Sequence, residues 1–109
     1  MYFYPMYYYN VTCHAEHAIE TKWLEWMKHT HIPEVMQTGC FTECRMLKLI
    51  SPEHIEHGPT YAIQYLYNSP TDFDKYIAKH ADVLRDKTFK EFGNAIHAFR
   101  TQLEIIAQF

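Results

Sequence analysis

Glycine and proline residues divide this 109-residue chain into six segments, and this division constrains the fold more than any other feature. Both residue types interrupt helices and strands, glycine through its backbone freedom and proline through its missing N–H donor. The breaks fall at Gly39, Ser51-Pro52, Gly58-Pro59, Ser69-Pro70 and Gly93. The chain is short enough for one core and shows no repeat or linker. We therefore expect a single domain over residues 6–109, preceded by an N-terminal extension of residues 1–5.

Four of the segments favour β-strands. Residues 6–13 are rich in tyrosine, and residues 60–68 alternate so that three tyrosines and an isoleucine share one face. Residues 41–50 and 95–107 are the other predicted strands. The polar loop at residues 51–59 suits a hairpin, so the strands on either side of it should be antiparallel neighbours.

The first helix is predicted over residues 15–31, where apolar side chains recur at helical spacing. These are Ile19, Trp23, Trp26, Met27 and Thr30. Pro33 should end this helix near His31, because the residue before a proline avoids the helical region. A short helical turn over residues 33–38 should then close on Gly39.

The second helix should begin at Ser69, which is a favoured N-cap residue, with Pro70 at the first helical position and Asp72 in the first turn. An apolar stripe follows at helical spacing. It comprises Phe73, Tyr76, Ile77, His80, Ala81 and Leu84.

The resulting order, β-α-β-β-α-β, predicts an α+β fold of the ferredoxin-like type, a four-stranded antiparallel sheet with two helices on one face. The other face should not be cleanly polar, because Ala62, Gln64 and Leu66 alternate with the tyrosine row. An exposed apolar sheet face usually has a partner. We therefore expect a homodimer formed through the sheet face, as in a dimeric α+β barrel.

Composition and charge exclude several classes of protein. Aromatic residues make up 17% of the chain, enough for a substantial core and too many for a disordered protein. The net charge is −3 and no basic run occurs, so nucleic-acid binding is not expected. The uncharged N-terminal stretch, residues 1–12, is too short to span a membrane and lacks the features of a secretory signal. We predict a cytoplasmic location, with Cys13, Cys40 and Cys44 as reduced structural thiols.

Several motifs occur in order along the chain, and together they carry a family resemblance. They include Tyr8-Tyr9-Asn10-Val11-Thr12, Trp23-Leu24-Glu25-Trp26-Met27, His31-Ile32-Pro33-Glu34-Val35, Thr38-Gly39-Cys40-Phe41 and Ala98-Phe99-Arg100-Thr101. Through them the chain resembles the uncharacterised bacterial domain-of-unknown-function family numbered 4286. That family is similar to the dimeric α+β barrel superfamily, which includes small monooxygenases, muconolactone isomerases and haem-degrading enzymes. The resemblance implies the fold and the dimer, and it implies no catalytic residue.

His31 and Arg100 are the candidate catalytic residues. His31 lies beside the predicted break at Pro33, where a histidine could serve as a general base or orient a ligand carbonyl; alternatively it binds the last helix carbonyls. Arg100 lies mid-strand, where a half-buried guanidinium requires a carboxylate or an anionic ligand. Glu43 or Glu104 could be a structural partner for it.

A second set of residues is assigned to ligand binding. The candidates are Trp23, Met27, Tyr65 and His80, although a lone histidine on an apolar stripe is more often a core residue. His14 and His17 are three residues apart, which alone is a weak metal signal, so we predict neither a metal site nor a cofactor.

Two functions fit these residues. The first is a homodimer that binds a small apolar or aromatic molecule without catalysis. The second is a cofactor-independent monooxygenase or isomerase, with His31 as base and Arg100 or a tyrosine stabilising a developing oxyanion.

Overall fold

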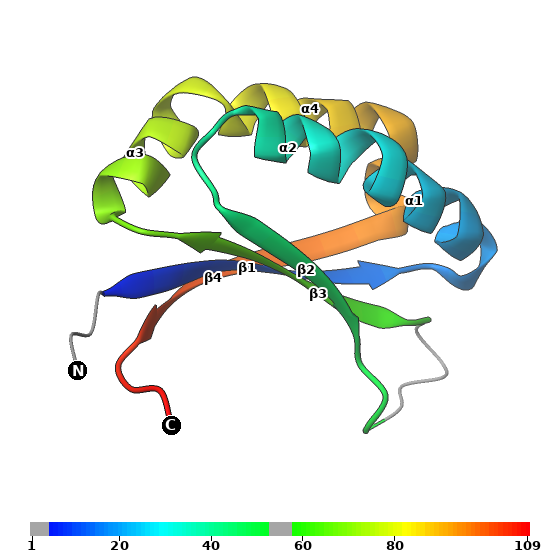
Figure 1. Ribbon diagram of the computed structural model, residues 1–109. Helices are drawn as coiled ribbons and strands as arrows, with labels where there is room; N and C mark the ends of the chain where they lie inside the picture. Colours follow the sequence, from blue (N-terminus) through cyan, green and yellow to red (C-terminus); the bar gives the residue numbers. More distant parts are fainter. Residues whose placement is uncertain (1–4, 53–57) are drawn as a thin grey trace.

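Four antiparallel strands form one sheet, and the helices of the described chain pack on one face of it (Figure 1). The computed structural model describes residues 5–52 and 58–109. The strands are β1 (Met6–Ala15), β2 (Glu43–Lys48), β3 (Thr60–Tyr67) and β4 (Ile96–Ile105), in the sheet order β2-β3-β1-β4. The predicted ferredoxin-like α+β fold is thereby confirmed, including the antiparallel pairing of β2 with β3.

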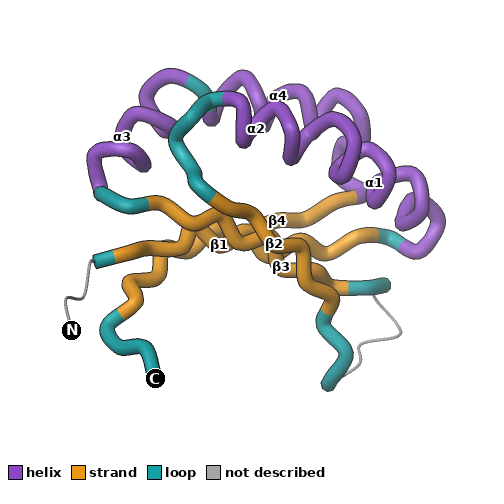
Figure 2. Tube along the Cα trace, in the orientation of Figure 1, coloured by secondary structure: helices purple, strands orange, loops and turns teal. Residues whose placement is uncertain are grey.

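The helical layer is more divided than the two predicted helices. Its elements are η1 (His17–Ile19), α1 (Glu20–Trp26), η2 (Met27–His31), α2 (Ile32–Gln37), α3 (Pro70–Lys79), α4 (Ala81–Phe92) and η4 (Gly93–Ala95). Figure 2 shows this layer above the sheet, with the second sheet face bare.

The strand register decides which side chains face the helices. Tyr9 pairs with Tyr65 across β1 and β3, and Val11 pairs with Arg100 across β1 and β4. Cys44 of β2 also pairs with Tyr65. Because side chains alternate along each strand, odd-numbered residues of β1 and β3 share the inner face with even-numbered residues of β2 and β4.

The predicted helix end before Pro33 is wrong. The chain instead passes through a π-helical turn, η2, in which the Ile32 N–H bonds to the carbonyl of Met27 five residues earlier, and continues as α2. The wider turn accommodates the missing N–H of Pro33 within a continuous helical path. The short helix after Pro33 is confirmed as α2, and Gly39 follows it with a φ of +76°.

The second predicted helix divides at His80. Its backbone there leaves the helical region, with φ −128° and ψ −34°, and separates α3 from α4. Ser69 takes the predicted N-cap position, but its hydroxyl makes no capping bond to a helix amide and contacts the Asp72 carboxylate at 3.4 Å.

The core between the two layers is predominantly aromatic. The Tyr9 ring contacts the rings of Phe41, Tyr65, Phe73 and Tyr76, with centroid separations of 5.0 to 5.9 Å. Such offset and edge-on contacts add to the free energy gained by burying apolar area. Residues from the sheet, from α3 and from the segment before β2 therefore meet at one side chain.

Some predictions concern residues outside the described ranges. Residues 1–4 of the predicted extension and residues 53–57 of the predicted polar loop belong to this group. The three cysteines lie within the described chain and are free thiols, as predicted. Across residues 5–52 and 58–109, no helix combines the length and apolar character needed to cross a membrane.

Replacing Ile63 with alanine should strongly destabilise the fold. Ile63 lies on inner strand β3 with 0% of its surface exposed, so we expect a loss of about 2–5 kcal/mol in the free energy of unfolding. The matched control is Ile106→Ala, because Ile106 is 83% exposed, and its effect should stay within about 0.5 kcal/mol. Urea denaturation measures both; equal effects would contradict this description of the core.

Candidate functional site

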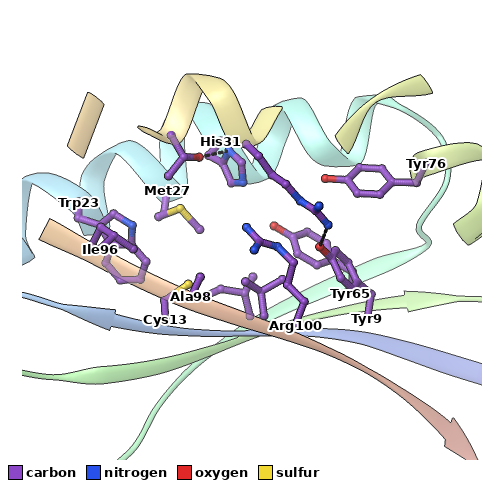
Figure 3. A pocket seen from close by; sticks show the side chains of 14 residues that line it. Tyr9, Cys13, Trp23, Met27, His31, Tyr65, Tyr76, Ile96, Ala98 and Arg100 are labelled. Carbon is purple, nitrogen blue, oxygen red and sulfur yellow. Dashed lines mark hydrogen bonds between the residues drawn. The ribbon is translucent and has the colours of Figure 1, made fainter. Parts of the chain in front are cut away.

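A cavity of about 50 Å³ lies between the helices and the inner face of the sheet, over β1 and β4 (Figure 3). Since a single water needs about 10–15 Å³ measured with a water-sized probe, this cavity has room for a few water molecules. Its lining comprises Tyr9, Val11, Cys13, Trp23, Met27, His31, Ile63, Tyr65, Tyr76, Arg85, Thr88, Ile96, Ala98 and Arg100. Ala98 and Arg100 belong to the inner face yet are exposed, so the cavity opens to solvent along edge strand β4.

The π turn places two lining residues over the cavity. Met27 and His31 are the first and last residues of η2, and Trp23 precedes them by one turn in α1. A π turn holds more residues than an α-helical turn, so it changes the direction in which the following side chains point. In Figure 3 His31 points from the helical layer toward the sheet, above Arg100.

The environment of His31 keeps its imidazole neutral at physiological pH. Burial lowers the pKa of His31 to about 4; the carboxylate of Glu34 opposes this shift, and the guanidinium of Arg100 adds to it. The ring stacks on Trp26, with centroids 5.1 Å apart, and its Nδ1 is 3.5 Å from the Thr88 hydroxyl. At pH 7 this imidazole can accept a hydrogen bond, but its low pKa makes it a weak general base.

Two of the three arginines in the sequence line this cavity. Arg85 of α4 donates from Nη2 to the Tyr9 hydroxyl at 3.1 Å, while its buried Nε has no hydrogen-bond partner among the described residues. Arg100 rises from β4 into the cavity (Figure 3). Among the described residues that line the cavity, none is acidic.

The structural ion pair considered for Arg100 does not form within the described chain. Glu43 pairs with Leu66 on the outer face of the sheet, so it lies on the wrong side. Glu104 is four residues along the same strand, about 13 Å away at the usual rise per residue. The nearby carboxylate of Glu34 is already bound by Lys87, with Nζ and Oε2 2.7 Å apart.

The Cys13 thiol and the phenols of Tyr65 and Tyr76 stay protonated at neutral pH. Burial raises the pKa of the Cys13 thiol to about 11, and it also raises the pKa values of Tyr65 and Tyr76. Cys13 is therefore a poor nucleophile at neutral pH. The phenols remain hydrogen-bond donors.

The structure brings five of the six predicted site residues to this cavity. His31, Arg100, Trp23, Met27 and Tyr65 line it. His80 lies outside the lining, at the junction of α3 and α4, with its ring centroid 6.4 Å from that of Tyr76.

Arg85 and Thr88 are cavity residues that sequence reasoning missed. They are three residues apart on α4, beyond the predicted apolar stripe, which ends at Leu84. The available signal was that arginine is scarce in the sequence. Its position gave no further indication, because Arg85 lies just after the end of the apolar stripe.

The described residues contain no group of three or more His, Cys, Asp or Glu side chains arranged to hold a metal ion. His14 lies near the end of β1, and its Nδ1 is 3.1 Å from the Thr60 hydroxyl.

The fold and its cavity define a ferredoxin-like α+β protein. The chain belongs to the family described as "Domain of unknown function (DUF4286)", whose model matches residues 6–106. No curated protein matches the chain.

Two solved structures share the fold. A dimeric ferredoxin-like protein from an uncultured marine organism is 12% identical, with a TM-score of 0.70 over 96% of this chain and 99% of its own. An ethyl tert-butyl ether d (ethd) family protein from Bacillus halodurans is 7% identical, with a TM-score of 0.64 over 87% of this chain and 96% of its own. At these identities the likeness establishes the fold alone.

The low pKa of His31 should make the fold less stable in acid. The unfolded state gains a proton near pH 6.5 and the folded state only near pH 4, so stability falls as pH drops through this window and levels off below it. Relative to His31→Asn, the native protein should lose up to about 3 kcal/mol of unfolding free energy between pH 7 and pH 4. Urea unfolding at each pH measures the difference; parallel pH profiles would contradict the burial of His31.

Proposed function

We propose that this protein is a cytoplasmic homodimer that binds a small apolar or aromatic molecule at the cavity between helices and sheet, with part of the molecule in the opening along β4. The observation that carries the binding proposal is the lining itself. Aromatic and aliphatic side chains form most of it, and a few polar groups converge on the same space, as in typical small-molecule sites. Three free thiols support a reducing, cytoplasmic location.

The two ends of the cavity differ in chemistry. Trp23, Met27 and Cys13 form an apolar and sulfur-rich end, while Tyr9, Tyr65 and Tyr76 form a phenolic end (Figure 3). Methionine and aromatic side chains make favourable, adaptable contacts with aromatic rings. Such a lining suits a ligand with an apolar body and a polar group.

The bare face of the sheet supports the homodimer. It carries large exposed apolar side chains, including Phe99 (64% exposed) and Leu103 on β4 and Leu47 on β2. At its centre, Asn10 bonds to Thr12, Thr101 and Gln64. This polar centre is already hydrogen-bonded within the chain, so a partner can cover it at low cost.

A second copy of the chain is the partner that fits this face. Association of two identical faces by a two-fold axis is the commonest arrangement of soluble homo-oligomers. The ferredoxin-like relative from the marine organism is described as dimeric, and its fold covers nearly all of this chain.

An enzymatic function is the second candidate. It is favoured by one observation, that His31 and Arg100 line the same cavity. The low pKa of His31 weighs against it as a base, because a general base works best with a pKa near the operating pH. Oxygen-dependent or isomerising turnover of an enolisable aromatic substrate, lost in His31→Asn, would favour this second function over simple binding.

Binding in the cavity should change the NMR signal of the Met27 methyl group. In protein labelled with ¹³C at the methionine methyls, titration with small aromatic compounds such as benzamide and benzoate should shift Met27, which lines the cavity. The Met36 methyl is the control, because Met36 of α2 does not line it. No movement of Met27 with any compound would contradict the proposed binding function.

Charging the bare sheet face should separate the dimer. Phe99→Asp places a carboxylate at the proposed interface, which opposes burial of that face. Sedimentation analysis should show a dimer for the native protein and a monomer for the variant. The matched control is Phe89→Asp on α4, where Phe89 is 61% exposed on the helical side, and this variant should remain dimeric. A monomeric native protein would overturn the homodimer.

A further inference from the structure

We propose that the ligand of this cavity carries a carboxylate, and that the guanidinium groups of Arg85 and Arg100 bind it. This inference rests on the proposed binding function and names the class of ligand. It follows from an imbalance in the cavity, which holds two permanent positive charges and no acidic side chain in its described lining.

The balance of hydrogen-bond donors and acceptors in the lining also favours an anionic ligand. Guanidinium groups only donate, and the phenols of Tyr65 and Tyr76 remain protonated donors. The acceptors in the lining are a few hydroxyl oxygens and the neutral imidazole of His31. Buried donors need acceptors, so a ligand that complements this site must supply oxygen lone pairs.

Arg85 shows this need most clearly. Its bond to the Tyr9 hydroxyl holds the guanidinium in place, yet no group in the described part of the chain accepts a hydrogen bond from the buried Nε. A carboxylate matches the planar guanidinium and can accept two parallel N–H bonds from it. Arg100 approaches the cavity from the sheet and reaches solvent at the opening, where it can meet an entering anion.

The remainder of the lining favours a carboxylate with an apolar body over inorganic phosphate. Aliphatic and thioether side chains cannot bind a second charged part of a ligand, and the lining supplies such side chains at Val11, Met27, Ile63 and Ile96. The volume of about 50 Å³ limits the buried part of the ligand to a small group, with the rest in the opening along β4.

The test compares carboxylates with neutral amides of the same shape. Benzoate and butyrate are ionised at pH 7, whereas benzamide and butyramide are neutral, so each pair differs mainly in charge. Affinity is measured from the Met27 methyl shift, with sodium phosphate as a further probe. We expect each carboxylate to bind about tenfold more tightly than its amide, as for charge-assisted hydrogen bonds, and this ratio to fall with added salt.

The variant Arg100→Gln should reduce that ratio from about ten to a value between about one and three. The variant Arg100→Lys should retain part of the ratio, because lysine keeps the positive charge but lacks the planar guanidinium that binds both carboxylate oxygens. Arg100 is exposed on an edge strand, so the fold should tolerate both changes. The matched control is Arg45→Gln, which removes the same charge from the outer face of β2 and should leave the ratio unchanged.

The outcomes separate this inference from the proposed function. Equal binding of amides and carboxylates would overturn the carboxylate assignment and leave the binding function standing. Phosphate binding as tightly as the carboxylates would also overturn it, because the apolar lining would then contribute nothing. Failure of all the organic compounds to shift Met27 would overturn both. The salt dependence in the native protein tests the assignment even if the Arg100 variants fail to fold.

Discussion

Tyr9, near the middle of strand β1, contributes both to the packing of the core and to the polar contacts of the cavity. Its ring holds together the aromatic core, through contacts with Phe41, Tyr65, Phe73 and Tyr76 that join the sheet to the helical layer. Its hydroxyl accepts a hydrogen bond from the guanidinium of α4 that faces the cavity. One side chain thus links the packing that stabilises the fold with the polar group that defines the site. A buried tyrosine requires such a partner, because an unpaired phenol in the core would destabilise the protein.

The helices cover the inner face unevenly, and this explains where the cavity lies. Strands β1 and β3 are central, and their inner residues are mostly buried, whereas inner residues of edge strand β4 remain exposed. The π turn in the first helical region places Met27 and His31 over this less covered part of the sheet. Irregular helical turns of this kind are frequent at functional sites, because they direct side chains that a regular helix would align elsewhere. The outer face of the sheet has no helical cover in the described chain.

Much of the fold was predictable, because its signals are local. The alternation of Tyr61, Ile63 and Tyr65 indicated both a strand and its buried face, and the structure confirms both. The end of the first helix was mispredicted at Pro33, because the rule for the residue before a proline assumes regular helical geometry, and the π turn avoids the conflict. The break at His80 has no local signal either, since the apolar spacing runs through it. Irregular turns depend on how the helix packs against the sheet, and spacing along the chain does not report this.

The element order, the αβ layering and the choice of His31 and Arg100 as candidates follow from the amino-acid sequence, because periodicity, capping residues and unusual polar positions are properties of short stretches. The three-dimensional packing was needed to show that these two residues share a cavity, that Arg85 joins them, and that His80 does not. Strand register and helix placement bring together cavity residues that are up to about ninety positions apart, and the resulting burial lowers the pKa of His31 and raises that of Cys13. Burial and charge balance are sums over many distant neighbours, which is the physical reason that no single segment could reveal them.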